Sequence, residues 1–144
     1  QFQQNWESIS NNSSKGVMYK LFTNLDFRCQ PYVNCNLSNY MKKVLARFRT
    51  SNHKLPIETG RWNDIERSNR LCNLCNRDIG DEFHYILCCT VLKNEREKYI
   101  PNFYLFRPNI VKFNELFSSN NVSLLSKLCK FISIVNEKAK PPGY

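Results

Sequence analysis

Apolar residues recur at helical spacing over two long stretches of the chain. In residues 37–48 they line one side of a helix, and Asn36 or Ser38 is placed to cap its first turn. The stripe consists of Leu37, Tyr40, Met41, Val44, Leu45 and Phe48. Residues 122–135 carry a second stripe of the same kind. We expect two amphipathic helices whose stripes lie in the core.

Shorter periodic segments extend this helical pattern. Residues 2–9 and 17–25 carry apolar residues three or four apart, and residues 91–100 favour a helix that ends before Pro101. Pro108 suits the first position of a further helix. The apolar face of that helix is predicted to hold Ile110, Phe113, Leu116 and Phe117.

Prolines and short polar runs separate the predicted helices. Residues 26–36 are expected to be irregular, because Pro31 disfavours helical conformation in the residue before it. The polar run at residues 118–121 marks a break before the final helix. The C-terminal residues 138–144 are expected to form a polar tail.

Residues 53–70 lack a long helical pattern, because they contain a proline and a glycine. We expect a short extended piece at Leu55 and Ile57, followed by a turn at Gly60. Trp62 and Ile65 are expected to pack against the segment that follows.

The most specific chemical signal lies in residues 71–90, LCNLCNRDIGDEFHYILCCT. The spacing is C-x2-C-x8-H, followed by two adjacent cysteines. Four side chains can therefore close on one metal ion: Cys72, Cys75, His84, and either Cys88 or Cys89. Thiolate and imidazole suit Zn²⁺, and four protein ligands leave no open position for water. The pattern predicts a structural zinc site that hydrolyses nothing.

The fourth ligand depends on the local helix geometry. A hairpin-like turn over residues 70–77 and a helix from about Asp81 are expected to present the ligands. The acidic residues Asp81 and Glu82 suit the first turn of that helix, because negative charge interacts favourably with the positive end of the helix dipole. In an α-helix His84 and Cys88 are four residues apart and share a face. Cys89 would require the helix to adjust locally. Spacing alone slightly favours Cys88 and leaves both open.

Two other interpretations of these cysteines are weaker. Ordinary buried thiols are common, but they rarely show this ligand spacing. A redox role for the C-x2-C pair needs a βαβ context, which the pattern lacks. Three further cysteines stand outside the motif, Cys29, Cys35 and Cys129.

Length and composition indicate a single, mostly α-helical domain. The 144 residues are 42% hydrophobic and include only four glycines, which favours a real core and few tight turns. We predict a small helical bundle with an inserted CCHC zinc-binding turn-helix module. Its parts would be an N-terminal helical arm (1–35), a basic helix with the zinc module (36–100), a C-terminal helical pair (101–137) and the tail.

The net charge of +9 is concentrated around the motif. Nine basic residues are candidate nucleic-acid contacts: Lys42, Lys43, Arg47, Arg49, Lys54, Arg61, Arg67, Arg70 and Arg77. Such a segment is typical of a nucleic-acid binder, although a solvated helix face gives the same charge. His53 and Trp62 are further candidates, because aromatic rings can stack on bases.

Several runs of the chain resemble one known family. FRTSNHKLPIETGRW (residues 48–62), RLCNLC (70–75), DEFHYILCC (81–89) and NEREKY (94–99) look like the zinc-binding segment downstream of reverse transcriptase in non-LTR retrotransposon polyproteins of invertebrates. The resemblance covers residues 47–100. It implies the ligand set Cys72, Cys75, His84 and Cys89, with Cys88 at a variable position.

The resemblance also implies a function. The chain would be a non-catalytic C-terminal part of a retrotransposon-derived protein, helping to bind RNA or DNA without sequence preference. Its partners would be nucleic acid and the reverse transcriptase domain of the same polyprotein. The alternative is a zinc-stapled helical module that docks on the reverse transcriptase or another protein. A steep loss of affinity with salt would distinguish the first from the second.

The expected location is inside the cell, in the nucleus or cytoplasm. The sequence shows neither a signal peptide nor an apolar run long enough for a membrane, so we expect reduced thiols and no membrane partner. Because the sequence begins with Gln1, we expect it to be a piece of a longer open reading frame.

Overall fold

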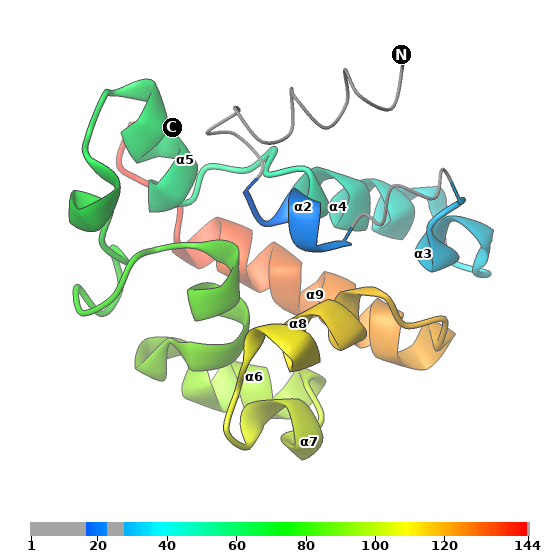
Figure 1. Cartoon of the computed structure of the whole chain (residues 1–144). Coiled ribbons are helices and arrows are strands. Elements are labelled where there is room, and N and C mark those ends of the chain that lie inside the picture. The colour runs from blue at the N-terminus through cyan, green and yellow to red at the C-terminus, as the bar shows by residue number, and fades with distance from the viewer. Residues whose placement is uncertain (1–16, 23–27, 144) are drawn as a thin grey trace, which may run out of the picture.

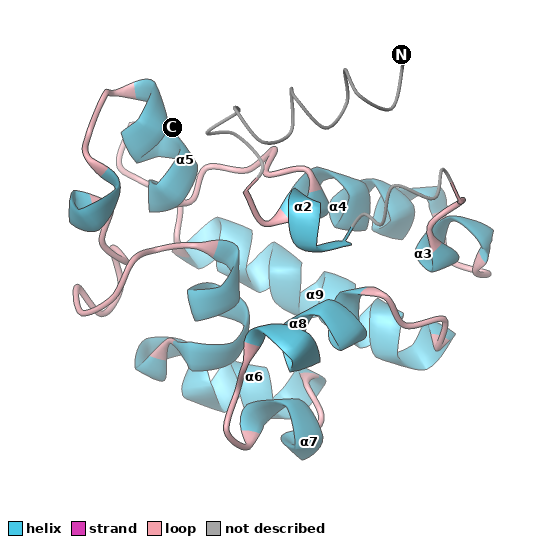
Figure 2. Cartoon of the chain, viewed as in Figure 1, coloured by secondary structure: helices cyan, strands magenta, loops and turns pink. Residues whose placement is uncertain are grey.

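The computed structural model describes residues 17–22 and 28–143, and this part of the chain is mostly helical (Figure 1; Figure 2). Its α-helices are α2 (Tyr19–Phe22), α3 (Pro31–Asn34), α4 (Asn39–Arg49), α5 (Pro56–Trp62), α6 (Lys93–Tyr99), α7 (Asn102–Leu105), α8 (Ile110–Phe117) and α9 (Val122–Lys138). Three shorter helical turns are η1 (Arg67–Asn69), η2 (His84–Cys88) and η3 (Thr90–Leu92). The described residues contain no β-strand. The predicted mostly α-helical bundle is confirmed.

Helix α9 forms the centre of the core. It packs against both α4 and α6, and Figure 1 shows it in orange and red across the middle of the molecule. Six of its side chains are buried: Leu125, Leu128, Cys129, Phe131, Ile132 and Val135. Each buried leucine or phenylalanine stabilises the fold by about 1.5–3 kcal/mol. The segments 36–100 and 101–137, predicted as parts of one domain, share one core.

Ser38, one of the two predicted caps, caps the first turn of helix α4. The Ser38 hydroxyl oxygen accepts a hydrogen bond from the backbone N–H of Met41, 3.2 Å away. Leu45 and Phe48 are buried as the stripe predicts, but Tyr40 is 66% exposed. Tyr40 lies in the first turn of the helix, where its polar hydroxyl end can stay in water.

Prolines open two helices that the sequence pattern did not predict. Pro31 begins α3 and Pro56 begins α5. At the first helical position the missing N–H removes no hydrogen bond, and the fixed φ of proline already suits a helix. Helix α3 therefore interrupts the segment that was expected to be irregular. Of the two residues expected to be extended, Leu55 is extended and Ile57 is helical.

The start of α8 also differs from the prediction. Pro108 was expected at the first helical position, but α8 begins at Ile110. Asn109 is the cap, because its side-chain oxygen accepts the backbone N–H of Lys112 at 2.9 Å. Ile110, assigned to the apolar face, is exposed, whereas the other three members of that face are buried.

Gly60 lies inside α5 rather than in a turn. A Cβ at this position would come within 2.5 Å of the Arg70 side chain, so the glycine lets Arg70 cross the helix closely. Arg70 donates hydrogen bonds to the carbonyl oxygens of Ile65 (2.8 Å) and Ile57 (3.1 Å). Trp62 and Ile65, expected to pack against the motif, are 46% and 43% exposed.

Arg49 is buried rather than available to a nucleic acid. Its guanidinium donates to the carbonyl oxygen of Phe117 (2.7 Å) and to the side chain of Gln30 (2.6 Å). It also lies 4.5 Å from the ring centroid of Phe22 and 5.3 Å from that of Tyr32. Arg49 therefore joins α4 to three other segments, which corrects its assignment as a phosphate contact.

Arg49→Met is expected to lower the free energy of unfolding by about 2–3 kcal/mol, because the Phe117 carbonyl loses a charged donor. Arg47→Met, an exposed position of the same helix, is expected to change it by less than about 0.5 kcal/mol. Urea unfolding followed by circular dichroism measures both. Equal stability of the two variants would contradict this role of Arg49.

Some sequence predictions lie outside the described residues. The helix predicted at residues 2–9 is one, and of the helix predicted at 17–25 the structure describes only α2. Among the described residues, no helix is both long and apolar enough to cross a membrane.

Candidate metal centre

The first two ligands lie on a tight hairpin. Leu71 and Ile79 form an isolated antiparallel bridge, and the backbone N–H of Cys72 donates to the carbonyl oxygen of Asp78 at 2.8 Å. The turn closes when the N–H of Asn76 donates to the carbonyl oxygen of Cys72, also at 2.8 Å. Asn76 has φ of 52°, a left-handed conformation that asparagine tolerates better than most residues. The predicted hairpin-like turn is present.

The other two ligands lie on a helix that widens into a π-turn. Asp81 caps its start by accepting the backbone N–H of His84 at 2.9 Å. Residues His84–Cys88 then form the π-helix η2, and the N–H of Cys89 donates to the carbonyl oxygen of His84 at 2.7 Å. A π-turn bonds residues five apart rather than four. The sequence spacing predicted that the helix would have to adjust locally for Cys89 to join the site, and the π-turn is this adjustment.

The hairpin and the π-turn bring four ligand atoms together. Those of Cys72, Cys75, His84 and Cys89 all lie within 4.8 Å of one another. The sulfurs of Cys72 and Cys89 are 3.8 Å apart, and the sulfur of Cys75 is 3.3 Å from Nε2 of His84. An ion about 2.3 Å from each sulfur in a tetrahedron would separate two sulfurs by about 3.8 Å. The cluster therefore fits one metal ion.

Neighbouring contacts favour a metal over other uses of these thiols. None of the seven cysteines, all within the described residues, forms a disulfide bond. Nδ1 of His84 lies 3.7 Å from a carboxylate oxygen of Asp78, so Nε2 is left to face the thiols. A carboxylate behind the second ring nitrogen is common around metal-binding histidines.

The ionisation of the ligands is coupled to metal binding. Burial opposes ionisation of Cys75, but hydrogen bonds from the Arg77 and Asp78 backbone and from neighbouring thiols lower its pKa overall. Burial raises the pKa of Cys89 to about 12 and lowers that of His84, which favours neutral imidazole. A divalent cation stabilises thiolates, so its binding would release the Cys89 proton.

Arg96 is a buried cation beside the site. The sequence did not predict its role. Its guanidinium donates to the carbonyl oxygens of Ile86 (2.7 Å), Tyr85 (3.1 Å) and Cys89 (2.8 Å). In an α-helix the N–H of Cys89 would bond to the Tyr85 carbonyl. Here that N–H bonds to His84, and Arg96 supplies a donor to Tyr85 instead. Arg96 therefore stabilises the π-turn that carries the ligands.

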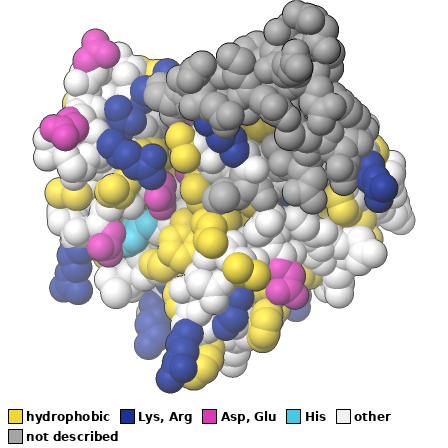
Figure 3. Space-filling view, viewed as in Figure 1, with side chains coloured by type: hydrophobic (Ala, Val, Ile, Leu, Met, Phe, Trp, Pro, Cys, Tyr) yellow, Lys and Arg dark blue, Asp and Glu magenta, His cyan; other side chains and the backbone are white. Residues whose placement is uncertain are grey.

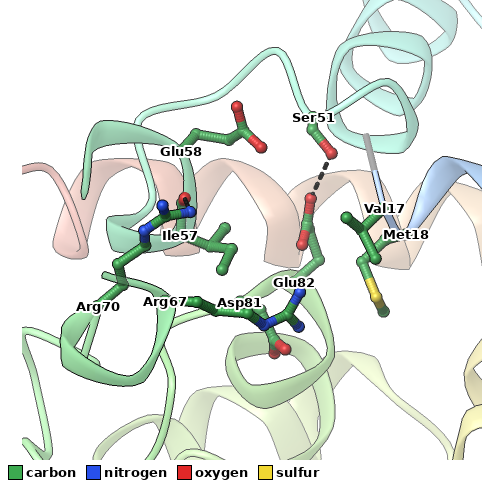
Figure 4. Close-up of a pocket in the computed structure, with 9 residues that line it drawn as sticks. All are labelled: Val17, Met18, Ser51, Ile57, Glu58, Arg67, Arg70, Asp81 and Glu82. Carbon is green, nitrogen blue, oxygen red and sulfur yellow. Dashed lines mark hydrogen bonds between the residues drawn. The ribbon is translucent and has the colours of Figure 1, made fainter. Parts of the chain in front are cut away.

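A buried carboxylate anchors the start of the ligand helix to the loop after α4. Glu82 accepts hydrogen bonds from the Ser51 hydroxyl (2.7 Å) and shares one with Nε2 of His53 (2.8 Å); Figure 4 shows the first. Burial raises the pKa of Glu82, but the bonds from His53 and Ser51 outweigh it, and the pKa lies below its ordinary value. His53 is therefore an internal partner of Glu82, which corrects its assignment as a base-stacking residue.

The cavity beside Glu82 is too small for an organic ligand. Its volume is about 20 Å³, roughly that of one water molecule. In Figure 4 the Arg67 side chain extends toward the Asp81 carboxylate at the edge of the cavity. Burial raises the pKa of Asp81 overall, although the Arg67 cation acts in the opposite direction. This cavity is part of the packing around the helix.

Two further contacts that the sequence did not predict hold the hairpin in place. The backbone N–H of Asn73 donates to the Tyr85 hydroxyl oxygen at 3.2 Å, and its side chain donates to the carbonyl oxygen of Ala139 at 2.8 Å. Gly80 packs so closely that an added Cβ would lie 3.0 Å from the Cα of Cys72. Neither role can be predicted from the residue type, because each depends on what packs against Asn73 or Gly80 in the folded chain.

The nine predicted nucleic-acid contacts divide into three groups. Five are exposed: Lys43, Arg47, Lys54, Arg67 and Arg77. Three are partly buried and make contacts within the protein, with a carbonyl oxygen or a carboxylate as acceptor: Lys42, Arg61 and Arg70. The ninth, Arg49, is the buried residue described above. On the face seen in Figure 3, dark-blue side chains gather over α5.

The fold and the site define a small helical protein with four side chains placed to hold one metal ion. No family model, curated protein or solved structure matches the chain. The resemblance to retrotransposon proteins therefore remains a prediction.

Proposed function

We propose that this chain is a structural zinc module of a retrotransposon-derived protein that binds RNA or DNA through its exposed basic residues. The observation that carries the proposal is the cluster of three thiols and one imidazole, with the exposed Arg67 and Arg77 close to its cysteines in the sequence. Three thiolates and an imidazole favour Zn²⁺ over harder ions. The retrotransposon origin rests on the sequence resemblance alone.

Zinc would act as a structural element rather than as a catalyst. Four protein ligands leave no position for a reacting water, so the module performs no hydrolysis. Zn²⁺ with three thiolates carries a formal charge of about −1. Arg96, inside the protein, offsets this charge, and Arg77 and Arg67 at the surface stay available to phosphates. The reverse transcriptase domain of the same polyprotein is the proposed intramolecular partner.

Salt-dependent binding tests the nucleic-acid part of the proposal. We expect the affinity for a labelled RNA or DNA strand to fall steeply with salt, because phosphate contacts release counterions. Arg67→Gln with Arg77→Gln should reduce the slope of log K against log salt by about 2. Fluorescence anisotropy titration measures both quantities.

The matched control carries the same loss of charge elsewhere. Lys127→Gln with Lys130→Gln changes two exposed residues of α9 and should leave most of the slope intact. Equal losses from the two double variants would reduce the proposal to an effect of net charge. Binding that does not change with salt would support the alternative, a zinc-stapled protein-interaction module.

A further inference from the structure

An exposed apolar surface lies on α7, the loop after it and the first turn of α8. Phe103, Phe106, Ile110 and Val111 are 57%, 68%, 42% and 70% exposed. Most large apolar side chains of a folded protein are buried, and a contiguous exposed group marks an interaction surface. We name this group, together with Arg107 and Lys112, the α7–α8 patch.

Lys112 joins the two exposed phenylalanines of the patch. Its ammonium donates to the carbonyl oxygens of Phe103 and Phe106, and it lies 4.8 Å and 5.9 Å from the two ring centroids. The guanidinium of Arg107 lies 5.3 Å from the ring centroid of Phe106. Figure 3 shows apolar and basic side chains side by side over α7 at the lower edge of the molecule.

We propose that the α7–α8 patch binds a segment of a partner protein that carries apolar side chains flanked by carboxylates. The apolar side chains would cover Phe106 and Val111, and the carboxylates would face Arg107 and Lys112. Interfaces are enriched in aromatic residues and arginine, and complementary charge selects the partner. This proposal goes beyond nucleic-acid binding and does not depend on it.

The charge of the patch argues against a second copy of this chain as the occupant. A symmetric dimer brings the same surface of each copy together. Arg107 and Lys112 would then face the same cations of the other copy, with Glu115 as the one acidic residue of α8. Like charges across an interface oppose association.

The arrangement of the rings argues against single-stranded nucleic acid. Bases stack on open aromatic faces beside cations that contact phosphates. Here Lys112 lies over both rings, where a base would stack, and Phe103 packs edge-on against Tyr104 with centroids 5.1 Å apart. Val111 adds apolar area that a base does not need for stacking.

A pair of peptides tests the proposal on the full, metal-loaded chain. The first is a synthetic amphipathic helix with leucines on one face and glutamates on its flanks, and the second has lysines in place of the glutamates. We expect only the first to bind, with amide shifts in two-dimensional NMR confined to α7 and the start of α8. Phe106→Ser with Val111→Ser should weaken this binding at least about tenfold.

Matched variants separate the patch from general effects. Val33→Ser with Val122→Ser changes two other exposed apolar residues and should leave peptide binding unchanged. Arg67→Gln with Arg77→Gln should also leave it unchanged, whatever that pair does to nucleic-acid binding. Equal binding of both peptides, or no loss in the Phe106 and Val111 variant, overturns the proposal.

Two results would assign the patch to another occupant and thereby overturn the proposal. One is an oligothymidylate strand that shifts the same amides and loses affinity in the Phe106 and Val111 variant. The other is self-association in sedimentation equilibrium that the same variant abolishes.

Discussion

Replacing Cys89 with serine is expected to remove the metal ion from the chain, whereas Cys88→Ser leaves it bound. The sulfur of Cys89 lies 3.8 Å from that of Cys72 inside the four-ligand cluster. Cys88 is its sequence neighbour but is absent from that cluster. Elemental analysis of the purified variants gives the metal content, and Cys72→Ser is the control for a lost ligand.

Metal loss should also lower stability. A metal present at about 1,000 times its dissociation constant stabilises the folded chain by about 4 kcal/mol, and a variant without the site loses this term. The unfolding temperature of Cys89→Ser should therefore be insensitive to added zinc or chelator, whereas Cys88→Ser should respond as the unmodified chain does. Loss of metal from Cys88→Ser with retention in Cys89→Ser would contradict the register of the site.

Long helices could be predicted because their signal is repeated several times. The stripe of α9 places an apolar residue on one face at every turn, and the core uses that face, so the prediction needed no knowledge of the neighbours. The short helices α3 and α5 carry too few turns for such a signal. Each begins with a proline, and a proline in a sequence is equally consistent with a helix break and with the first residue of a helix.

The residue types of the ligand set could be predicted from spacing, but the choice between Cys88 and Cys89 could not. Spacing alone identified two cysteines and His84, yet an ideal α-helix would have made Cys88 the fourth ligand. The resemblance named Cys89, and the structure places Cys89 in the cluster. Arg96, a residue of α6, donates to carbonyl oxygens of the π-turn that brings Cys89 there, and a local sequence pattern does not predict such a contact.

Surface and buried arginines could not be distinguished from the sequence. Arg47 and Arg49 stand two residues apart in one basic run, but a helix turns by about 200° over two residues. Arg47 therefore faces water while Arg49 faces Phe117 and Phe22. Net charge describes such a segment only on average, and the residues that can reach a phosphate are a subset of it.

Arg96→Met is the second change with a large expected effect. The variant keeps apolar contact near Phe131 but leaves the carbonyl oxygens of Tyr85, Ile86 and Cys89 without the guanidinium. We expect a loss of about 3–5 kcal/mol in the free energy of unfolding, because several buried acceptors lose a charged donor at once. Metal affinity should fall about 10–100-fold, as it does when residues that orient ligands are changed.

The identity of the fourth ligand, Cys88 or Cys89, supplies a readout that a loss of stability alone would not change. If Arg96 maintains the π-turn, its removal lets the helix relax toward α-geometry, in which residues four apart share a face. Cys88 then becomes able to bind the ion. In the Arg96→Met background, Cys88→Ser should therefore lower the metal content, although it does not do so in the unmodified chain.

Cobalt substitution measures this change, because the absorption of bound Co²⁺ depends on the number of thiolates and on their geometry. Lys98→Met, an exposed position on the same helix α6, serves as the control and should leave both the spectrum and the stability unchanged. Arg96→Lys should restore only part of the affinity, since one ammonium lacks the planar fork that reaches several carbonyl oxygens. An unchanged cobalt spectrum in Arg96→Met would show that the π-turn is held by the metal ligands themselves.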